Sequence, residues 1–436
     1  MLLARLFRDP SGGVAPLLAL CLIPLVGAVG AAIDYSRAAS ARTAMQAAGD
    51  AAALMLSKQA GTLTADQLQQ NASSFFLANF SNHPEAQNVQ VNATYDKGTS
   101  GYIVTVTASA TVHASFLGIM GISQIPITTT GTVNWSNAKL RVALVLDNTG
   151  SMSQSGKLTA LKTAATNLLT QLQNAAQSNG DVYVSIIPFV KDVNAGSGNY
   201  QANWIDWSLW DAANGTCSKS TYTNKTNCTT NNGIWTPKNH NTWNGCVTDR
   251  DQNYDTVNNG PTSGALFPAE QYSACPASLM GLTYDWTSLN SKINSMVANG
   301  STNQAIGLAW GWQSLTNAPL TVPPLDPNYQ YRQIIILLTD GLNTQDRWYG
   351  NGSNASPQVD ARQQILCNNI NAAGVTLYAV QVNTDGSPTS TLLQNCAGSP
   401  NKYPDPSKFF LLTSSSQIIT TFQQIGTALT QLHLSK

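Results

Sequence analysis

Residues 333–339 contain the run Ile-Ile-Ile-Leu-Leu, which constrains the fold more than any other feature of this chain. Successive side chains of a strand point to opposite faces, so a strand with this sequence must be covered on both sides. Residues 141–146 form a second run of the same buried character. Strands of this kind are typical of parallel sheets that carry helices on both faces.

Strands and helices alternate from Leu140 onward, and this alternation predicts an α/β domain with a mostly parallel sheet. The apolar spacing predicts strands at 141–146, 181–190, 333–339 and 375–382, with an edge strand at 409–412. It predicts helices at 158–177, 288–297, 304–315, 359–373, 389–396 and 417–434.

Oxygen-bearing side chains follow both buried strands. Asp147, Thr149 and Ser151 come directly after the first strand at two-residue spacing. Asp340 comes directly after the second strand, and Thr302 precedes a predicted helix. Open α/β sheets bind their ligands at the carboxyl ends of the strands. Carboxylates and hydroxyls are hard ligands, which suit Mg²⁺ or a similar divalent ion better than zinc.

From about residue 139 to 436 the chain resembles the von Willebrand factor type A fold, with one large interruption. The resemblance rests on three sequences, Asp147-Asn148-Thr149-Gly150-Ser151, Gly300-Ser301-Thr302-Asn303 and Leu337-Leu338-Thr339-Asp340-Gly341.

In that family, these three loops meet as a metal-ion-dependent adhesion site. Asp147, Thr149 and Ser151 match its DxSxS element, and Thr302 and Asp340 match the ligands of the second and third loops. Thr149 replaces the usual serine, but its hydroxyl can still coordinate. The resemblance implies a divalent cation, Mg²⁺ with Ca²⁺ or Mn²⁺ as alternatives, and a vacant position for water or for a partner's carboxylate. The alternative is a hydrogen-bonded loop cluster that holds no ion.

The interruption, residues 193–285, has no clear periodicity, and long loops of this kind are usually functional or poorly ordered. It carries four cysteines and the tryptophans Trp204, Trp207, Trp210, Trp235 and Trp243. These rings either stack on a sugar or a protein, or form the core of a small loop-rich lobe, which is the interpretation we favour. Trp310 and Trp312 lie on a predicted helix and are expected to be packing residues.

Six of the seven cysteines lie downstream of residue 200, while Cys21 lies in an apolar N-terminal run. An even number in an exported region favours three disulfides. Proximity along the chain favours the pairs Cys217–Cys228, Cys246–Cys275 and Cys367–Cys396, and reduced buried thiols are the alternative. CxxC spacing is absent from the sequence, which argues against zinc.

The apolar run extends from about residue 12 to 33, and as a helix its 22 residues would span roughly 33 Å, enough to cross a bilayer. Arg5 and Arg8 precede it, which predicts a cytoplasmic N-terminus and an exported remainder. A cleaved signal peptide ending near Ala28-Val29-Gly30 is the alternative. A prepilin-type signal is not expected, because no Glu follows the early glycines at the required spacing.

Beyond the apolar run, residues 36–58 are rich in alanine and predict a helix that continues out of the bilayer as a stalk or packs on partner helices. A second helix is expected at 65–80, and alternating residues between 89 and 137 predict a small antiparallel sheet. The expected organisation is an anchor and stalk at 1–60, an α+β module at 61–138, and the α/β domain at 139–436.

The N-terminal region resembles the TadE/TadG-like part of Flp (tight adherence) pilus-assembly proteins. That family has an Asp just past the span, here Asp34, followed by a Gln-x-Ala-x-Asp-Ala-Ala-Ala-Leu-like run. Gln46, Ala48, Asp50 and Leu54 match this run. With a type A domain after it, the chain is similar to TadG. The resemblance implies a single-pass inner-membrane protein, periplasmic in bulk, that binds pilus or secretion-system components.

A surface adhesin for host or matrix ligands remains the alternative to an assembly protein. An enzyme is not expected, because the sequence has no GxSxG, HExxH or P-loop motif. Nucleic-acid binding is not expected either, since 22 Lys and Arg balance 22 Asp and Glu and charged residues make up only 10% of the chain.

Overall fold

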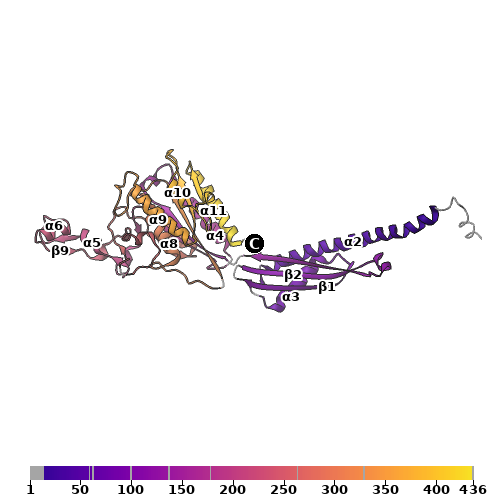
Figure 1. Ribbon diagram of the computed structural model, residues 1–436. Helices are drawn as coiled ribbons and strands as arrows, with labels where there is room; N and C mark the ends of the chain where they lie inside the picture. Colours follow the sequence, from indigo (N-terminus) through magenta and orange to yellow (C-terminus); the bar gives the residue numbers. More distant parts are fainter. Residues whose placement is uncertain are drawn as a thin grey trace, which may run out of the picture. The chain divides into compact units, whose positions relative to one another are not determined.

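The computed structural model describes residues 14–57, 59–60, 63–98, 101–135, 138–176, 178–262, 264–327 and 329–434. The chain divides into two compact units, with the boundary in the sequence between residues 137 and 138 (Figure 1). Arg5, Arg8 and the glycines at the start of the predicted apolar run lie outside the described residues.

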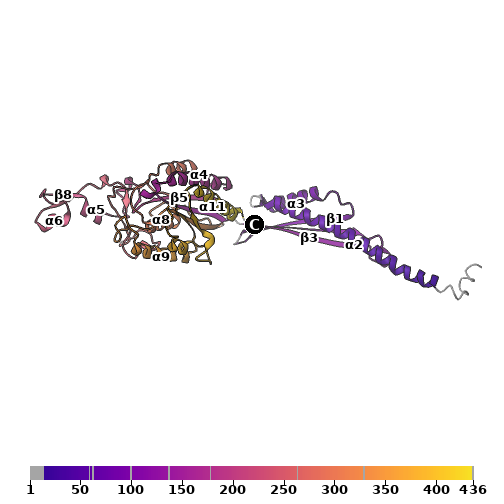
Figure 2. The same cartoon turned by 90° about the horizontal axis from the view of Figure 1, so that it is seen from above.

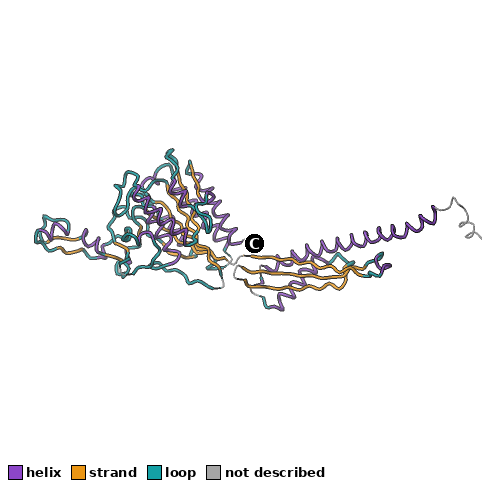
Figure 3. The backbone as a smooth tube through the Cα atoms, viewed as in Figure 1, coloured by secondary structure: helices purple, strands orange, loops and turns teal. Residues whose placement is uncertain are grey.

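The N-terminal unit contains two helices and one antiparallel sheet with the strand order β1-β2-β3. The helices are α2 (Val14–Ser57) and α3 (Ala65–Phe80), and the strands are β1 (Ala86–Gly98), β2 (Gly101–His113) and β3 (Gln124–Trp135). These elements confirm the predicted helices and the predicted antiparallel sheet. Figure 3 shows the strands running beside α2.

Helix α2 is continuous over 44 residues, but its two halves have different surroundings. Its first half exposes large apolar side chains such as Leu20 and Leu25, and the helix is long and apolar enough to cross a membrane. Its second half is buried against α3 and the sheet through Ala41, Met45 and Ala52. The region expected to be a stalk or a partner-binding helix is therefore part of this unit's own core.

The C-terminal unit, Ala138–Leu434, is a mixed α/β structure. Its main sheet has the order β10-β6-β5-β4-β13-β14-β15, in which the five strands from β5 to β15 are mutually parallel. The five are β5 (Val182–Phe189), β4 (Ala138–Asp147), β13 (Gln330–Thr339), β14 (Thr376–Val382) and β15 (Phe409–Leu412). Strand β15 ends this series, as the edge prediction required. On the other side, β12 (Met280–Thr283) and β6 (Val193–Asn194) pair with β5 antiparallel, and β10 (Cys246–Val247) pairs with β6.

Alternating side chains of the central strands enter two separate cores, which is why both strands read as continuously apolar. Val145 and Leu337 face one core, and Leu144 and Ile336 face the other. The first core is covered by α8 (Gln304–Thr316), α9 (Pro357–Ala372) and α10 (Thr391–Cys396). The second is covered by α4 (Lys157–Ala175), α7 (Trp286–Asn294) and α11 (Ser416–Leu434). Figure 2 shows α4 on one side of the sheet and α8 and α9 on the other.

The insertion contains only short helices and strands among its described residues, and these pack around tryptophans and disulfides. Trp210 and Trp243 are almost completely buried in the first core, and Trp204 and Trp207 pack against it. These four rings are therefore packing residues, as the favoured interpretation expected, but they extend the main α/β core and do not form the core of a separate lobe. Around them lie β7 (Ile205–Asp206), α5 (Ser208–Ala213), β8 (Gly215–Cys217), α6 (Lys225–Thr230), β9 (Trp235–Pro237) and β11 (Phe267–Pro268).

All three predicted disulfides are present, Cys217–Cys228, Cys246–Cys275 and Cys367–Cys396. Trp310 and Trp312 are buried on α8, as expected of packing residues.

Candidate metal centre

The first loop of the candidate site leaves β4 and folds back on its own carboxylate. Asp147 accepts a hydrogen bond from the Thr149 backbone N–H at 2.8 Å, and its other oxygen accepts one from the Thr339 hydroxyl at 2.7 Å. The Thr149 and Ser151 hydroxyls lie 3.0 Å apart. The two-residue spacing therefore places the three oxygen-bearing side chains together.

The third loop brings the second carboxylate to the same place. The Ser151 hydroxyl donates to Asp340 Oδ1 at 2.6 Å, which links the ends of the neighbouring parallel strands β4 and β13. Asp340 Oδ2 accepts from Lys157 Nζ, also at 2.6 Å. Lys157 is the first residue of α4 and is itself buried. An ammonium group therefore stands beside one of the two carboxylates.

Burial shapes the electrostatics of this cluster. Asp147 is fully buried, and the loss of hydration raises its pKa to about 7, with the nearby charge of Asp340 as the second cause. Hydrogen bonds from Thr149 and Thr339 act in the opposite direction without cancelling the effect. Two buried carboxylates that interact electrostatically destabilise the doubly charged state unless a cation neutralises them.

The second loop, with Thr302, is joined to both other loops. The Gly150 N–H donates to Gly300 O at 3.0 Å, and Gly300 has a φ of +83°, which a residue with a side chain would adopt only with strain. Thr302 O accepts from the Thr344 N–H at 2.9 Å. The loop of Thr302 therefore lies against the first and third loops, and its side chain is buried.

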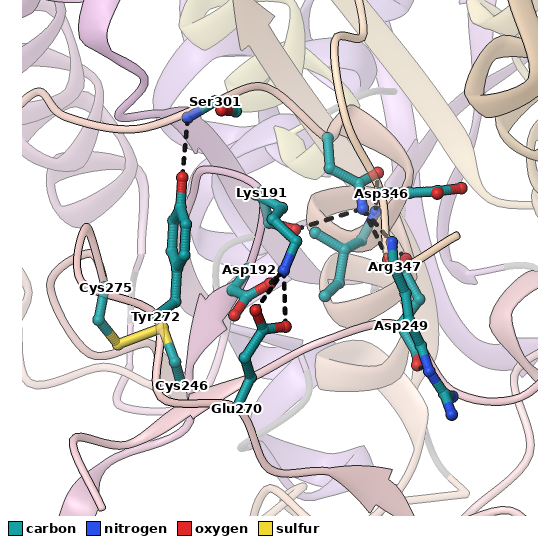
Figure 4. A network of polar contacts seen from close by, with 12 residues as sticks. Lys191, Asp192, Cys246, Asp249, Glu270, Tyr272, Cys275, Ser301, Asp346 and Arg347 are labelled. Carbon is teal, nitrogen blue, oxygen red and sulfur yellow. Dashed lines mark hydrogen bonds and ion pairs between the residues drawn. A yellow bond between two sulfur atoms is a disulfide. The ribbon is translucent and has the colours of Figure 1, made fainter. Parts of the chain in front are cut away.

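The insertion contacts the residues on both sides of Thr302 (Figure 4). The Tyr272 hydroxyl accepts from the Ser301 N–H at 3.1 Å. Asn303 Nδ2 donates to the Asp249 carboxylate at 2.9 and 3.1 Å. Burial is the main cause that raises the pKa of Asp249 to about 7. The insertion therefore supports the second loop directly.

A small charged network supports the same face of the insertion. Lys191 Nζ pairs with Glu270 at 2.5 Å and with Asp192 at 3.3 Å (Figure 4). Glu270 and Tyr272 lie on the segment that ends in the Cys246–Cys275 disulfide. The sheet end at β5, the disulfide and the second loop are thus connected by hydrogen bonds and ion pairs.

The donor set fits a hard divalent cation. Its linked members are the carboxylates of Asp147 and Asp340 and the hydroxyls of Thr149 and Ser151, and such oxygen ligands suit Mg²⁺ with water completing the shell. Thr302 adjoins the third loop through backbone hydrogen bonds, and among the described contacts its hydroxyl bonds none of these four residues. Among the described residues, no group of three or more His, Cys, Asp or Glu is placed to hold a metal. The Lys157 ammonium is a competing positive charge.

Two residues of this cluster were not predicted from the sequence. Thr339 stands in the quoted third-loop motif and could have been found there, because a hydroxyl directly before the aspartate can reach the neighbouring strand. Lys157 gave no comparable signal, since a lysine at the start of a helix is ordinarily solvated. The contacts of Asp249 and Tyr272 with the second loop gave none either.

The N-terminal motif residues pack α2 on the unit's own sheet. Gln46 Nε2 donates to Asp50 Oδ1 at 2.8 Å and to Thr130 O of β3 at 3.0 Å. A side chain at Gly131 would lie 2.7 Å from the Gly49 backbone, so the strand and the helix approach unusually closely here. Ala48 is buried, whereas Leu54 is half-exposed.

Residues 12–55 match the sequence model of the putative Flp pilus-assembly TadE/G-like family. The N-terminal region is therefore a TadE/G-like region, as Asp34 and the Gln46 to Leu54 run predicted. Together with the apolar first half of α2, this match fits a single-pass membrane anchor. A comparison with curated proteins gave no match.

Solved structures with partial likeness include two pilus proteins and a mussel byssus protein. The pilus adhesin SpaC from Lactobacillus rhamnosus GG is 13% identical over 80% of this chain and 34% of its own, with a TM-score of 0.36. The vWF domain of the pilus tip protein Mfa5 from Porphyromonas gingivalis is 10% identical over 69% of this chain and 97% of its own, with a TM-score of 0.37. The mussel byssus protein PTMP1, with a zinc-occupied MIDAS motif, is 13% identical over 68% of this chain and 47% of its own, with a TM-score of 0.32. This chain thus spans about a third of SpaC and about half of PTMP1.

Proposed function

We propose that this chain is a non-enzymatic, membrane-anchored envelope protein of Flp (tight adherence) pilus assembly. Its C-terminal unit is then a von Willebrand factor type A domain. Its metal-ion-dependent adhesion site consists of Asp147, Thr149, Ser151, Thr302 and Asp340. The site holds a divalent cation, Mg²⁺ before Ca²⁺ or Mn²⁺, and binds a protein partner from the pilus or secretion machinery.

The observation that carries this proposal is the pairing of Asp147 and Asp340 at the carboxyl ends of adjoining parallel strands. Ser151 bridges toward Asp340 at 2.6 Å, and Thr149 lies 3.0 Å from Ser151. Buried carboxylates cost free energy when they are charged and unneutralised, and a bound cation would remove that cost. A partner's carboxylate could then occupy a vacant coordination position.

The N-terminal region supports the cellular placement. A TadE/G-like region covers residues 12–55, and it coincides with the helix that could cross a membrane. We place the N-terminus in the cytoplasm because Arg5 and Arg8 precede the span. The C-terminal unit is then periplasmic, where its three disulfides can form.

Crosslinking pull-down from native membranes tests the function. The full chain should capture its partner, and a chelator or Asp147→Ala should abolish capture. Asp66→Ala removes an exposed carboxylate of α3 and should leave capture intact. Circular dichroism of both variants checks folding, and Asp147→Asn provides a variant of nearly the same shape.

Capture that survives both the chelator and Asp147→Ala would count against the metal bridge. Protease treatment of intact cells addresses the placement. We expect the C-terminal unit to be protected behind the envelope, whereas rapid cleavage would favour a surface adhesin.

A further inference from the structure

The connection between β2 and β3 exposes a compact set of large apolar side chains. It contains the short helix η2 (Leu117–Met120), and we call residues 116–122 the tip. Ile119 is 86% exposed and Met120 is 70% exposed, while Phe116 and Ile122 are about half-exposed. Residues 114–128 include no charged side chain. Soluble proteins rarely leave such a patch in water, so the tip needs an apolar partner.

The tip is fixed to the membrane helix by Asp34. Its carboxylate accepts hydrogen bonds from the backbone N–H groups of Ser115 at 3.1 Å, Phe116 at 2.7 Å and Leu117 at 2.8 Å. Asp34 is almost completely buried by these contacts. The residue just past the apolar run thus holds the start of η2 in place.

A second contact holds the tip against α2, one helical turn before Asp34. A side chain at Gly30 would lie 2.5 Å from the Phe116 side chain, so only glycine lets this ring rest on α2. Beside this contact, an apolar groove of about 740 Å³ lies between the helix and the tip. Its lining includes Leu22, Val26, Ala31, Ile119 and Met120.

The tip therefore stands at the level of residues 22–31 of α2, which belong to the membrane-crossing part of the helix. Groups at the same height beside a spanning helix meet the same medium. Five of the seven backbone N–H groups of the tip have partners within the chain, which reduces the cost of placing this segment in hydrocarbon. Besides the three bonds to Asp34, Ile119 donates to Phe116 O, Gly121 to Gly118 O and Ile122 to Leu117 O.

We propose that the tip is a second membrane contact, which inserts Phe116, Ile119, Met120 and Ile122 into the leaflet next to the folded units. The occupant of the groove and of the exposed face is lipid hydrocarbon. Continuity with the span favours lipid over a protein partner, because the same helix surface lines both. The inference rests on the single-pass anchor and is independent of the metal centre.

Site-specific labelling of the full chain in proteoliposomes tests this inference. In a Cys21→Ser background, an environment-sensitive fluorophore is placed at Ile119→Cys and, as the matched control, at Thr94→Cys. Thr94 is exposed on β1 opposite Thr105, roughly 26 Å along the sheet from the end of β2. The three native disulfides are kept oxidised so that only the introduced thiol reacts.

We expect the probe at residue 119 to be quenched by nitroxide-labelled lipids. In unlabelled samples, the thiol at 119 should react at least tenfold more slowly with a membrane-impermeant maleimide than the thiol at 94. Gly30→Val or Asp34→Ala should release the tip and reduce lipid quenching at 119. Equal maleimide reactivity at 119 and 94 would overturn the proposal. Protection from water without lipid quenching, or disulfide crosslinking of 119 between copies, would overturn it in favour of a protein partner.

Discussion

Two buried carboxylates, one in each unit, lie in opposite surroundings. Asp34 accepts three backbone N–H groups, and the bond from Leu117 is the main cause that lowers its pKa. Asp147 is equally inaccessible, but desolvation and the charge of Asp340 raise its pKa. The charge of Asp34 is stabilised by backbone N–H groups, whereas the charge of Asp147 is opposed by the negative charge of Asp340.

This difference separates a structural carboxylate from a ligand-binding one more sharply than burial does. A carboxylate surrounded by N–H donors is stable when charged and needs nothing from outside. Asp147 and Asp340 also accept hydrogen bonds, and Lys157 pairs with Asp340, but for Asp147 these bonds are outweighed by burial and by the second negative charge. We therefore expect an added cation to act on the C-terminal unit and to leave Asp34 and its surroundings unchanged.

The largest effect is expected from Asp147→Asn. Loss of one of two charged ligands should weaken Mg²⁺ or Mn²⁺ binding at least 100-fold, which corresponds to about 2.7 kcal/mol. Titration calorimetry on the purified chain measures this affinity. Asp34→Asn is the matched control and should leave metal binding unchanged while lowering the midpoint of thermal unfolding. Equal metal affinity in wild type and Asp147→Asn would remove the distinction between the two carboxylates.

Lys157→Met should increase metal affinity, by a smaller factor than Asp147→Asn decreases it. A metal ion must displace this ammonium from Asp340 or share the carboxylate with it, and a unit charge a few Å away is worth a few kcal/mol at partly buried sites. We expect metal to bind about tenfold more tightly to Lys157→Met. This corresponds to about 1.4 kcal/mol, which is less than the full electrostatic energy because the ion can share the carboxylate with the ammonium. Lys162→Met removes an ammonium of α4 that bonds Asn294 O instead of a carboxylate, and it should have no effect on metal binding. Weaker binding by Lys157→Met would instead show that the lysine orients Asp340 for the metal.

The sequence predicted those parts of the fold that depend on local patterns. The runs at 141–146 and 333–339 became the adjacent strands β4 and β13, because only a doubly covered sheet can bury them. The short intervals between cysteines led to the correct disulfides. Asp147, Thr149, Ser151 and Asp340 were brought together because the carboxyl ends of adjoining parallel strands meet at one edge.

The parts that were missed depend on long-range packing. An alanine-rich helix fits a stalk and a core helix equally well. The buried Ala41 and Met45 and the close approach of Gly131 to Gly49 show that α2 packs on its own sheet. Lys157 could not be assigned, because its reach to Asp340 depends on where α4 begins. The aperiodic insertion gave no sign that Tyr272 would contact Ser301.

Metal affinity should depend on pH through Asp147 and not through Asp34. Protons compete with the cation for Asp147, whose pKa is about 7, so affinity should fall about fivefold from pH 7 to pH 6. Calorimetry at both pH values measures the change. Asp34→Asn should show the same fall, because Asp34 binds no metal. A pH-independent affinity would show that Asp147 is already charged at pH 6.

Without metal, the two groups should shift stability with pH in opposite directions. The pKa of Asp147 is raised on folding, so its contribution is largest below its unfolded value near 4 and is lost as pH rises toward about 7. The pKa of Asp34 is lowered, so its contribution is present above its unfolded value and is lost as pH falls through the folded one. The pKa of Asp249 is also raised to about 7, so Asp249 affects stability over the same pH range as Asp147. The difference in unfolding free energy between wild type and Asp147→Asn, measured at each pH, isolates the contribution of Asp147.

The smallest effect is expected from the insertion, through Cys246→Ala with Cys275→Ala. This disulfide borders the segment of Glu270 and Tyr272, and Tyr272 accepts the Ser301 N–H next to Thr302. Loosening that support should weaken metal binding about threefold, since groups that orient ligands act more weakly than the ligands themselves. Removing the Cys217–Cys228 bond, which closes the β8–β9 hairpin region, is the matched control and should leave affinity unchanged. If both double variants bind metal like wild type, the insertion supports the fold of the second loop without tuning the metal centre.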